Sequence, residues 1–133
     1  MKYMLDTDMI VYIRNSRPEA VLKKFEQYDP QDICISAITL AELEYGVLNS
    51  SDSLRNRLGL WKFLSQIQVL PFDGKAAMEY GEIRSELKRK GQLIGANDLL
   101  IAAHARASEL ILVTNNVREF GRVSGLKLEN WMI

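Results

Sequence analysis

The stretch MKYMLDTDMIVYI, residues 1–13, contains two apolar runs separated by the acidic segment Asp6-Thr7-Asp8. The first run predicts a buried strand that ends just before Asp6, and the second predicts a helix. A carboxylate at the edge of a core is costly to desolvate unless a positive group meets it. The neighbouring sequence supplies no such group, so Asp6 indicates a positive partner from outside this segment.

The composition is that of one ordinary globular domain spanning residues 1–133. Hydrophobic residues make up 47% of the chain and charged residues 26%, and 17 basic residues balance 17 acidic ones. A net charge of zero gives no general attraction to polyanions. The single cysteine, Cys34, lies in an apolar run and is expected to be a buried thiol. No signal peptide is visible and no apolar run approaches the ~20 residues of a membrane span, so we expect a cytoplasmic protein.

Short apolar runs alternate with helical patterns along the chain. The runs that predict buried strands are KYML (2–5), ICIS (33–36), QVLPF (68–72) and LILVT (110–114), with LKLENWMI (126–133) as a possible last strand. Helices are predicted in 18–28, 37–48, 52–67 and 75–91, and a nearly all-apolar helix in 98–107. This alternation predicts an α/β fold with a parallel sheet covered by helices on both faces.

Two of these helices carry apolar residues on one stripe at helical spacing. The stripes are Leu54, Leu58 and Trp61 in 52–67, and Ala76, Tyr80, Ile83 and Leu87 in 75–91. Periodicity alone does not separate a core face from a dimer seam, for which Trp61, Phe63 and the helix around Tyr80 are surface candidates. Ser36 is a candidate N-cap for the helix that follows it, and Asn97 or Asp98 for the apolar helix.

Polar oxygens from four segments are expected at one crevice. Ligands of open α/β sheets bind outside the carboxyl ends of the strands, where Asp6, Asn115 and Asn116 are predicted to lie. Glu42 and Asp98 belong to helices that begin near the same edge. Such carboxylates repel one another unless a divalent cation joins them, and hard oxygen ligands without Cys or His favour Mg²⁺ or Mn²⁺. Asp6 is therefore placed to hold a metal.

With these motifs in place, the chain resembles the PIN-domain ribonucleases, and within them the VapC toxins of type II toxin–antitoxin pairs. MLDTDMI looks like the first motif of the family, ISAITLAELEYG like the second, IGANDLLIAAHA like the third and LVTNNVREF like the fourth. The order and spacing of the four motifs make the resemblance specific, and it covers essentially the whole chain.

The resemblance implies a three-layer α/β/α sandwich and Mg²⁺- or Mn²⁺-dependent RNA cleavage, usually by a homodimer. Carried over by position, Asp6, Glu42 and Asp98 are the acidic ligands, and Asn116 completes the catalytic set. Asn116 stands where an aspartate is frequent, and an amide contributes an oxygen but no charge. We therefore expect one well-held ion, and a second only if RNA phosphate or Asp8 completes its site. Asn116→Asp should strengthen metal binding if the residue belongs to the metal shell.

The resemblance also implies a VapB-type antitoxin that blocks the acidic site. The whole-chain pattern looks most like members that cut transfer RNA in the anticodon stem-loop, leaving 5′-phosphate and 3′-hydroxyl ends. Sequence preference would come from groove contacts on exposed bases, which none of the four motifs specifies.

Several residues have a second, purely structural interpretation. Asp6 and Asp98 are also candidate helix caps, and Asp8 suits the first turn of the helix after Asp6. Glu44 lies about 200° around its helix from Glu42 and His104 about 240° from Asp98, so both should point away from the site. The basic set Arg84, Lys88, Arg89 and Lys90 is expected to be a solvated helix end rather than a phosphate contact.

Two other functions compete with the nuclease. LDTDM also matches the Asp-x-Asp motif of haloacid dehalogenase-like phosphotransferases, but the acidic pair those enzymes need after a later strand is replaced here by Asn115 and Asn116. The second alternative is a PIN-like module that has lost cleavage and serves as a partner-binding or co-repressor subunit. Retention of Asp6, Glu42 and Asp98 favours the enzyme.

Overall fold

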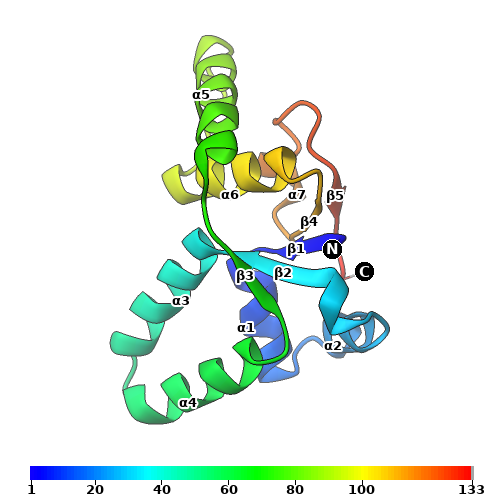
Figure 1. The fold of residues 1–133 in the computed structure, drawn as a ribbon, viewed down its shortest axis with the longest axis vertical. Coiled ribbons are helices and arrows are strands. Elements are labelled where there is room, and N and C mark those ends of the chain that lie inside the picture. Colours follow the sequence, from blue (N-terminus) through cyan, green and yellow to red (C-terminus); the bar gives the residue numbers. More distant parts are fainter. Residues whose placement is uncertain (133) are drawn as a thin grey trace.

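The computed structural model describes residues 1–132, which form a five-stranded sheet between two layers of helices (Figure 1). The strands are β1 (Tyr3–Leu5), β2 (Ile33–Ser36), β3 (Gln68–Leu70), β4 (Ile111–Val113) and β5 (Leu128–Glu129). The α-helices are α1 (Thr7–Asn15), α2 (Glu19–Glu26), α3 (Ala37–Leu48), α4 (Ser53–Leu64), α5 (Gly74–Arg89), α6 (Ala96–Ala107) and α7 (Val117–Phe120), and one 3₁₀ turn, η1, spans Pro30–Asp32.

The sheet is parallel throughout, with strand order β3-β2-β1-β4-β5. The chain moves from β1 outward through β2 to β3, then returns to the other side of β1 for β4 and β5. In register, Met4 of β1 lies beside Cys34 of β2 on one side and Leu112 of β4 on the other. The order of the strands therefore reverses between β1 and β4, next to the carboxylate that follows β1.

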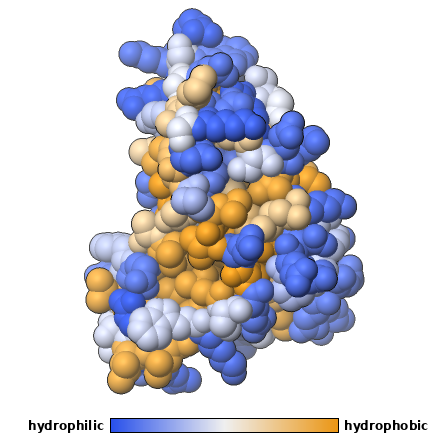
Figure 2. Space-filling view, in the orientation of Figure 1, coloured by the Kyte–Doolittle hydropathy of each residue, from blue (hydrophilic) through white to orange (hydrophobic). Residues whose placement is uncertain are grey.

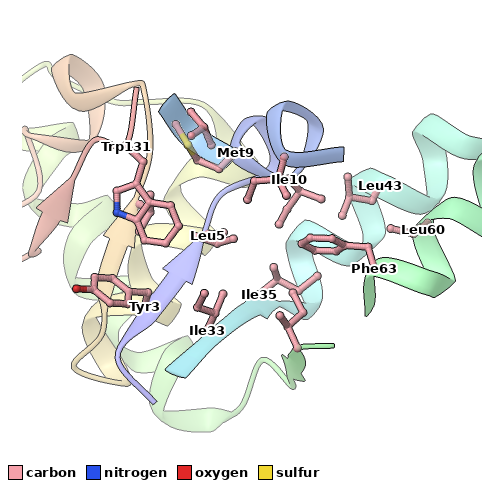
Figure 3. Packing of buried hydrophobic residues seen from close by; sticks show 14 of the residues in the cluster. Tyr3, Leu5, Met9, Ile10, Ile33, Ile35, Leu43, Leu60, Phe63 and Trp131 are labelled. Atoms are coloured by element: carbon pink, nitrogen blue, oxygen red, sulfur yellow. The ribbon is translucent and has the colours of Figure 1, made fainter. Parts of the chain in front are cut away.

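Alternate residues of the central strands feed two separate cores. Tyr3 and Leu5 of β1, with Ile33 and Ile35 of β2, pack against the first four helices, as Figure 3 shows. Met4 and Cys34 face the opposite side, where α5, α6 and α7 cover the sheet. This arrangement confirms the predicted three-layer α/β/α sandwich, because strands buried on both faces need apolar residues at every position.

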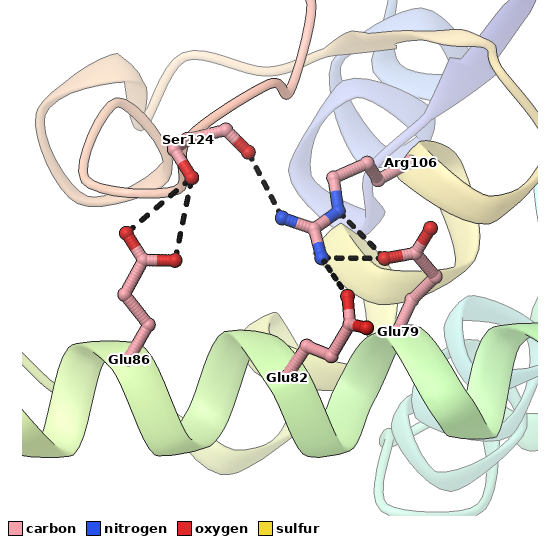
Figure 4. A network of polar contacts seen from close by, with 5 residues as sticks. All are labelled: Glu79, Glu82, Glu86, Arg106 and Ser124. Carbon is pink, nitrogen blue, oxygen red and sulfur yellow. Dashed lines mark hydrogen bonds and ion pairs between the residues drawn. The ribbon is translucent and has the colours of Figure 1, made fainter.

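Arg106 on α6 ties the second helical layer together. Its guanidinium donates to Glu79 at 2.9 Å and Glu82 at 3.2 Å, both on α5, and to the carbonyl oxygen of Ser124 at 3.0 Å (Figure 4). The Ser124 hydroxyl in turn donates to Glu86 on α5. One mostly buried cation therefore fixes α6, and with it the acidic residue at its start, relative to two other segments.

Most local predictions are confirmed. The Ser36 hydroxyl caps α3 by accepting a hydrogen bond from the Ile38 amide at 3.0 Å, and Asp8 lies in the first turn of α1. Cys34 is fully buried and Ala76, Ile83 and Leu87 face the core, with Tyr80 packed against it.

The structure decides which side of α4 is buried. The stripe of Leu54, Leu58 and Trp61 faces outward, with each residue more than half exposed, and Leu60 and Phe63 make the core contact. Two local predictions are wrong. The helix containing Asp98 begins earlier than predicted, at Ala96 after Gly95, and has no side-chain cap. The strand in 68–72 is not fully buried, because β3 lies at the edge of the sheet.

Within residues 1–132, none of the helices combines the length and the apolar character needed to cross a membrane.

Candidate functional site

The site lies where the strand order reverses, at the carboxyl ends of β1 and β4. This is the position at which open α/β sheets bind ligands, because the connections leaving two neighbouring strands diverge there. Asp6 directly follows β1 and Thr114 directly follows β4. The Thr114 hydroxyl donates to the Asp6 carboxylate at 2.5 Å, which closes the bottom of the crevice.

The Asp6 side chain is almost completely buried and has both oxygens engaged. One accepts the Thr114 hydroxyl and the other accepts the Met9 amide at 3.0 Å, which makes Asp6 the N-cap of α1. Burial raises the pKa of Asp6 to about 6, against the lowering effect of these two hydrogen bonds, and Asp8 and Asp98 raise it further. Asp6 is thus both the helix cap and the deepest acid of the crevice.

Asp98 reaches the same crevice from the first turn of α6. The turn begins at Gly95, where a Cβ atom would lie 3.4 Å from one Asp98 carboxylate oxygen, so the carboxylate folds back over the glycine. Burial raises the pKa of Asp98 to about 6, and the negative charges of Glu119, Glu42 and Asp8 raise it further. The carboxyl groups therefore interact through their charges although they come from distant parts of the chain.

Glu42 completes the acidic wall from the middle of α3. Its carboxylate accepts the Thr7 hydroxyl at 2.6 Å, which links α3 to the first residue of α1. Together, these residues enclose a cavity of about 180 Å³, which we call the acidic cavity; it is lined by Asp6, Thr7, Asp8, Glu42, Asp98 and Ile101.

The acidic cavity fits a hard divalent cation by its chemistry. All four of its ionisable lining residues are carboxylates, and none takes part in an ion pair among residues 1–132. Burial is the largest cause of the raised pKa values of Asp6 and Asp98, and neighbouring carboxylates add to it. Within residues 1–132, no three His, Cys, Asp or Glu side chains are already arranged as the ligands of a metal ion.

Asn116, the fourth predicted site residue, does not line the acidic cavity. Its side-chain amide donates to Glu119 at 3.1 Å, and its backbone amide donates to the Thr114 hydroxyl at 2.9 Å. Asn116 therefore lies behind the site, where it holds the β4–α7 turn and the Glu119 carboxylate.

Glu119 on α7 is the candidate site residue that our sequence analysis missed. Its charge is the largest electrostatic contribution to the raised pKa of Asp98. It belongs to the LVTNNVREF segment, and its spacing of three residues from Asn116 was the available signal, because i and i+3 lie on one face of a helix.

Residues expected to lie elsewhere do so. Glu44 forms an ion pair with Arg57 on α4, at 2.9 Å, and His104 shares a 2.7 Å hydrogen bond with Ser36 inside the second core. The basic end of α5 makes local contacts, since Arg84 donates to Tyr80 and Lys90 pairs with Glu86. None of these side chains lines the acidic cavity.

Comparison with known proteins identifies the family of this fold. Residues 3–126 match the PIN domain, and the chain belongs to this family. Ribonuclease VapC2 of Haemophilus influenzae is 46% identical over 132 residues, covering 99% of each chain, and the tRNA(fMet)-specific endonuclease VapC of Shigella flexneri is 44% identical over 131 residues, covering 98% of each. The matching chain in the crystal structure of VapBC2 from Rickettsia felis bound to a DNA fragment from their promoter superposes with a TM-score of 0.92 at 46% identity, over 98% of this chain and 99% of that one. These relatives place the chain in the VapC branch of the PIN domains and remove the phosphotransferase alternative.

Proposed function

We propose that this protein is a Mg²⁺-dependent endoribonuclease that acts as the toxin of a VapBC-type toxin–antitoxin pair, with the anticodon stem-loop of transfer RNA as its substrate. The observation that carries the proposal is the acidic cavity, in which Asp6, Glu42 and Asp98 converge with no Lys or Arg among the lining residues, at the switch point of a PIN fold. The names of the relatives support RNA as the substrate, and one of them is named for a transfer RNA.

Asp6, Glu42 and Asp98 would hold the Mg²⁺ ion, and Mn²⁺ would substitute for it. Bound at such a site, the ion lowers the pKa of a water and neutralises charge on the leaving oxygen. The protein's part is to fix the ligands: Thr114 and the Met9 amide orient Asp6, and Thr7 orients Glu42. No side-chain nucleophile is required for in-line attack by water, which leaves a 5′-phosphate and a 3′-hydroxyl.

The test is to incubate the purified protein with total bacterial transfer RNA, with Mg²⁺ or with EDTA, and to map new RNA ends. We expect discrete cuts in an anticodon stem-loop that require both Mg²⁺ and Asp6, with Asp6→Asn as the inactive control. Mg²⁺ binding without cuts in transfer, ribosomal or messenger RNA would contradict the nuclease and favour the non-catalytic partner-binding module.

We also propose a VapB-type antitoxin as partner, supported by the VapBC complexes among the structural neighbours. The antitoxin would inhibit by covering the acidic cavity. Co-expression with the VapB of a close relative should yield a stable complex that no longer cleaves transfer RNA. An active complex would contradict this mode of inhibition.

Finally, we propose that the protein is a homodimer. Apolar side chains gather in the hollow between α5 and the arm formed by α3 and α4, as Figure 2 shows, and Tyr45, Leu48 and Trp61 of that arm are each more than half exposed. Exposed apolar surface of this kind marks a protein contact. Phe63, which periodicity leaves open between the core and a dimer seam, belongs to the core. Sedimentation equilibrium should give twice the chain mass of 15.2 kDa, and a single-chain mass at micromolar concentration would contradict the dimer.

A further inference from the structure

A hollow lined by positively charged side chains, opposite in sign to the acidic cavity, lies between α1 and α4. It has a volume of about 360 Å³, and its charged lining residues are Arg14, Arg55 and Lys62. The other polar groups that line it are amide side chains, and there is no carboxylate among its lining residues. We call it the basic hollow. In a chain of zero net charge, three cations around one concavity are a local concentration of positive potential.

The charge of the basic hollow is not neutralised within the described part of the chain. None of the ion pairs between residues 1–132 includes Arg14, Arg55 or Lys62. Arg14 is only partly exposed and donates to a single neutral acceptor, the Asn56 carbonyl oxygen, at 3.1 Å. A partly desolvated guanidinium with unused donors is suited to an anionic oxygen.

The position of the Arg14 side chain depends on a glycine of α4. A Cβ atom at Gly59 would lie 3.0 Å from one Arg14 guanidinium nitrogen, closer than side chains normally approach. The guanidinium therefore lies against bare helix backbone, which holds it at the wall of the basic hollow.

A groove joins the basic hollow to the acidic cavity. This groove, of about 350 Å³, shares Thr7 and Glu42 with the acidic cavity and Arg14 and Asn56 with the basic hollow. Thr7, Val11 and Arg14 line its α1 side, as residues four and then three apart on one helix face do. Thr7 at one end of the groove and Arg14 at the other are seven residues apart in α1, a distance of about 10 Å along the helix axis.

We propose that the basic hollow binds backbone phosphates of the RNA strand whose neighbouring phosphodiester lies at the acidic cavity. This inference rests on the proposed ribonuclease function. The acidic cavity repels a polyanion, so attraction for the strand has to come from outside it. The groove gives a single strand a continuous path between the two sites, and the basic hollow supplies the uncompensated positive charge at its far end.

The test measures binding of fluorescently labelled bacterial transfer RNA over a range of KCl concentrations, in an Asp98→Asn background that prevents cutting. The variants are Arg55→Gln with Lys62→Gln, both exposed and outside the ion pairs of residues 1–132, and separately Arg14→Gln. Lys88→Gln with Arg89→Gln, which likewise removes one exposed Lys and one exposed Arg, here from α5, is the matched control. For the double variant we expect affinity lower by roughly tenfold and a salt slope shallower by about 0.7 for each phosphate that the protein no longer neutralises, with the control unchanged.

Equal affinity and salt slope in the double variant and the control would overturn the assignment. An acidic protein segment is the competing occupant, so polyglutamate binding is measured in parallel. If polyglutamate binding depends on Arg55 and Lys62 while RNA binding does not, the basic hollow belongs to a protein partner and the proposal is wrong. Cleavage of transfer RNA by the wild-type protein is assayed separately, so a failed nuclease proposal is distinguished from a failed phosphate site.

Discussion

Asp6 combines two roles that our sequence analysis treated as alternatives. Its carboxylate caps α1 through the Met9 amide and is also the deepest acid of the acidic cavity. The cap needs only an oxygen acceptor, whereas metal binding needs the negative charge. The two roles can therefore be separated by a substitution that keeps the oxygen and removes the charge.

Asp6→Asn is expected to abolish RNA cleavage and to make the metal-free protein more stable at pH 7. The amide oxygen still caps α1, while a buried charge whose pKa is raised to about 6 disappears. The gain in unfolding free energy should be on the order of 1–2 kcal/mol. Thermal unfolding in EDTA measures it, with Asp52→Asn, at the exposed N-cap of α4, as control. A lower melting temperature, or retained cleavage, would refute this account of Asp6.

Asn116→Asp tests the position of Asn116 behind the site. The Asn116 amide donates to Glu119, so an aspartate there would set two carboxylates against each other. The melting temperature in EDTA should fall by a few degrees, and added Mg²⁺ should raise it no more than it raises that of the wild type. Asn115→Asp is the control, because Asn115 contacts Asn130 instead. An unchanged melting temperature in EDTA would mean that the Asn116–Glu119 contact does not contribute to stability.

For single residues, the sequence was sufficient to predict the positions of the carboxylates that follow a strand or lie in the first turn of a helix. Asp6 and Asp98 could be predicted because the carboxyl edge of a parallel sheet is a fixed place in the fold. Glu119 had only its spacing from Asn116 as a signal, since it lies in a four-residue helix too short for a periodic pattern. Its proximity to Asp98 depends on how the turn after β4 folds.

Among the elements, α4 shows why a helical stripe alone does not identify the buried side. Leu54, Leu58 and Trp61 satisfy the spacing of a core face, yet Leu60 and Phe63 are the residues that pack inward. The helix has apolar residues on both sides, so periodicity permits two orientations. Contacts with α3 and the sheet choose between them, and neither is local in sequence.

The turn that ends α7 should tolerate no side chain at Gly121. A Cβ atom there would lie 2.6 Å from the Val117 carbonyl oxygen, which is backbone and cannot swing away. Gly121→Ala should therefore lower the unfolding free energy by about 1–3 kcal/mol and weaken cleavage, because α7 carries Glu119. Denaturant unfolding and a cleavage assay measure both effects. Gly81→Ala, on α5 with open space around it, should cost nothing, and equal effects of the two substitutions would contradict this prediction.

For the whole molecule, the acidic cavity makes stability depend on pH in a direction opposite to that of an ordinary salt-bridged protein. The pKa values of Asp6 and Asp98 are raised from 3.8 to about 6 in the folded protein. The folded state therefore binds more protons than the unfolded state between these values.

In EDTA, the melting temperature should accordingly rise as the pH falls from 7 through 6 towards 4. The Asp6→Asn, Asp98→Asn double variant gives the contribution of the other titrating groups, which is subtracted. Mg²⁺ should reverse the trend, because protons and the cation compete for the same carboxylates. Added Mg²⁺ should stabilise the wild-type protein at pH 7.5 far more than at pH 5. If the melting temperature in EDTA depended on pH in the same way in the wild type and the double variant, the claim that the charge of the acidic cavity is uncompensated would be wrong.

The position of β1 at the middle of the sheet also determines when the acidic cavity forms during synthesis. The first strand made is the central one, and the Thr114 hydroxyl that holds Asp6 comes 108 residues later. Contacts of such long sequence separation form late, after the entropy of a large loop has been overcome. A ribosome therefore releases almost the entire chain before the crevice between β1 and β4 exists. A truncated nascent chain that stops before β4 carries the carboxylates of Asp6, Glu42 and Asp98 without the strand that shapes them into a site.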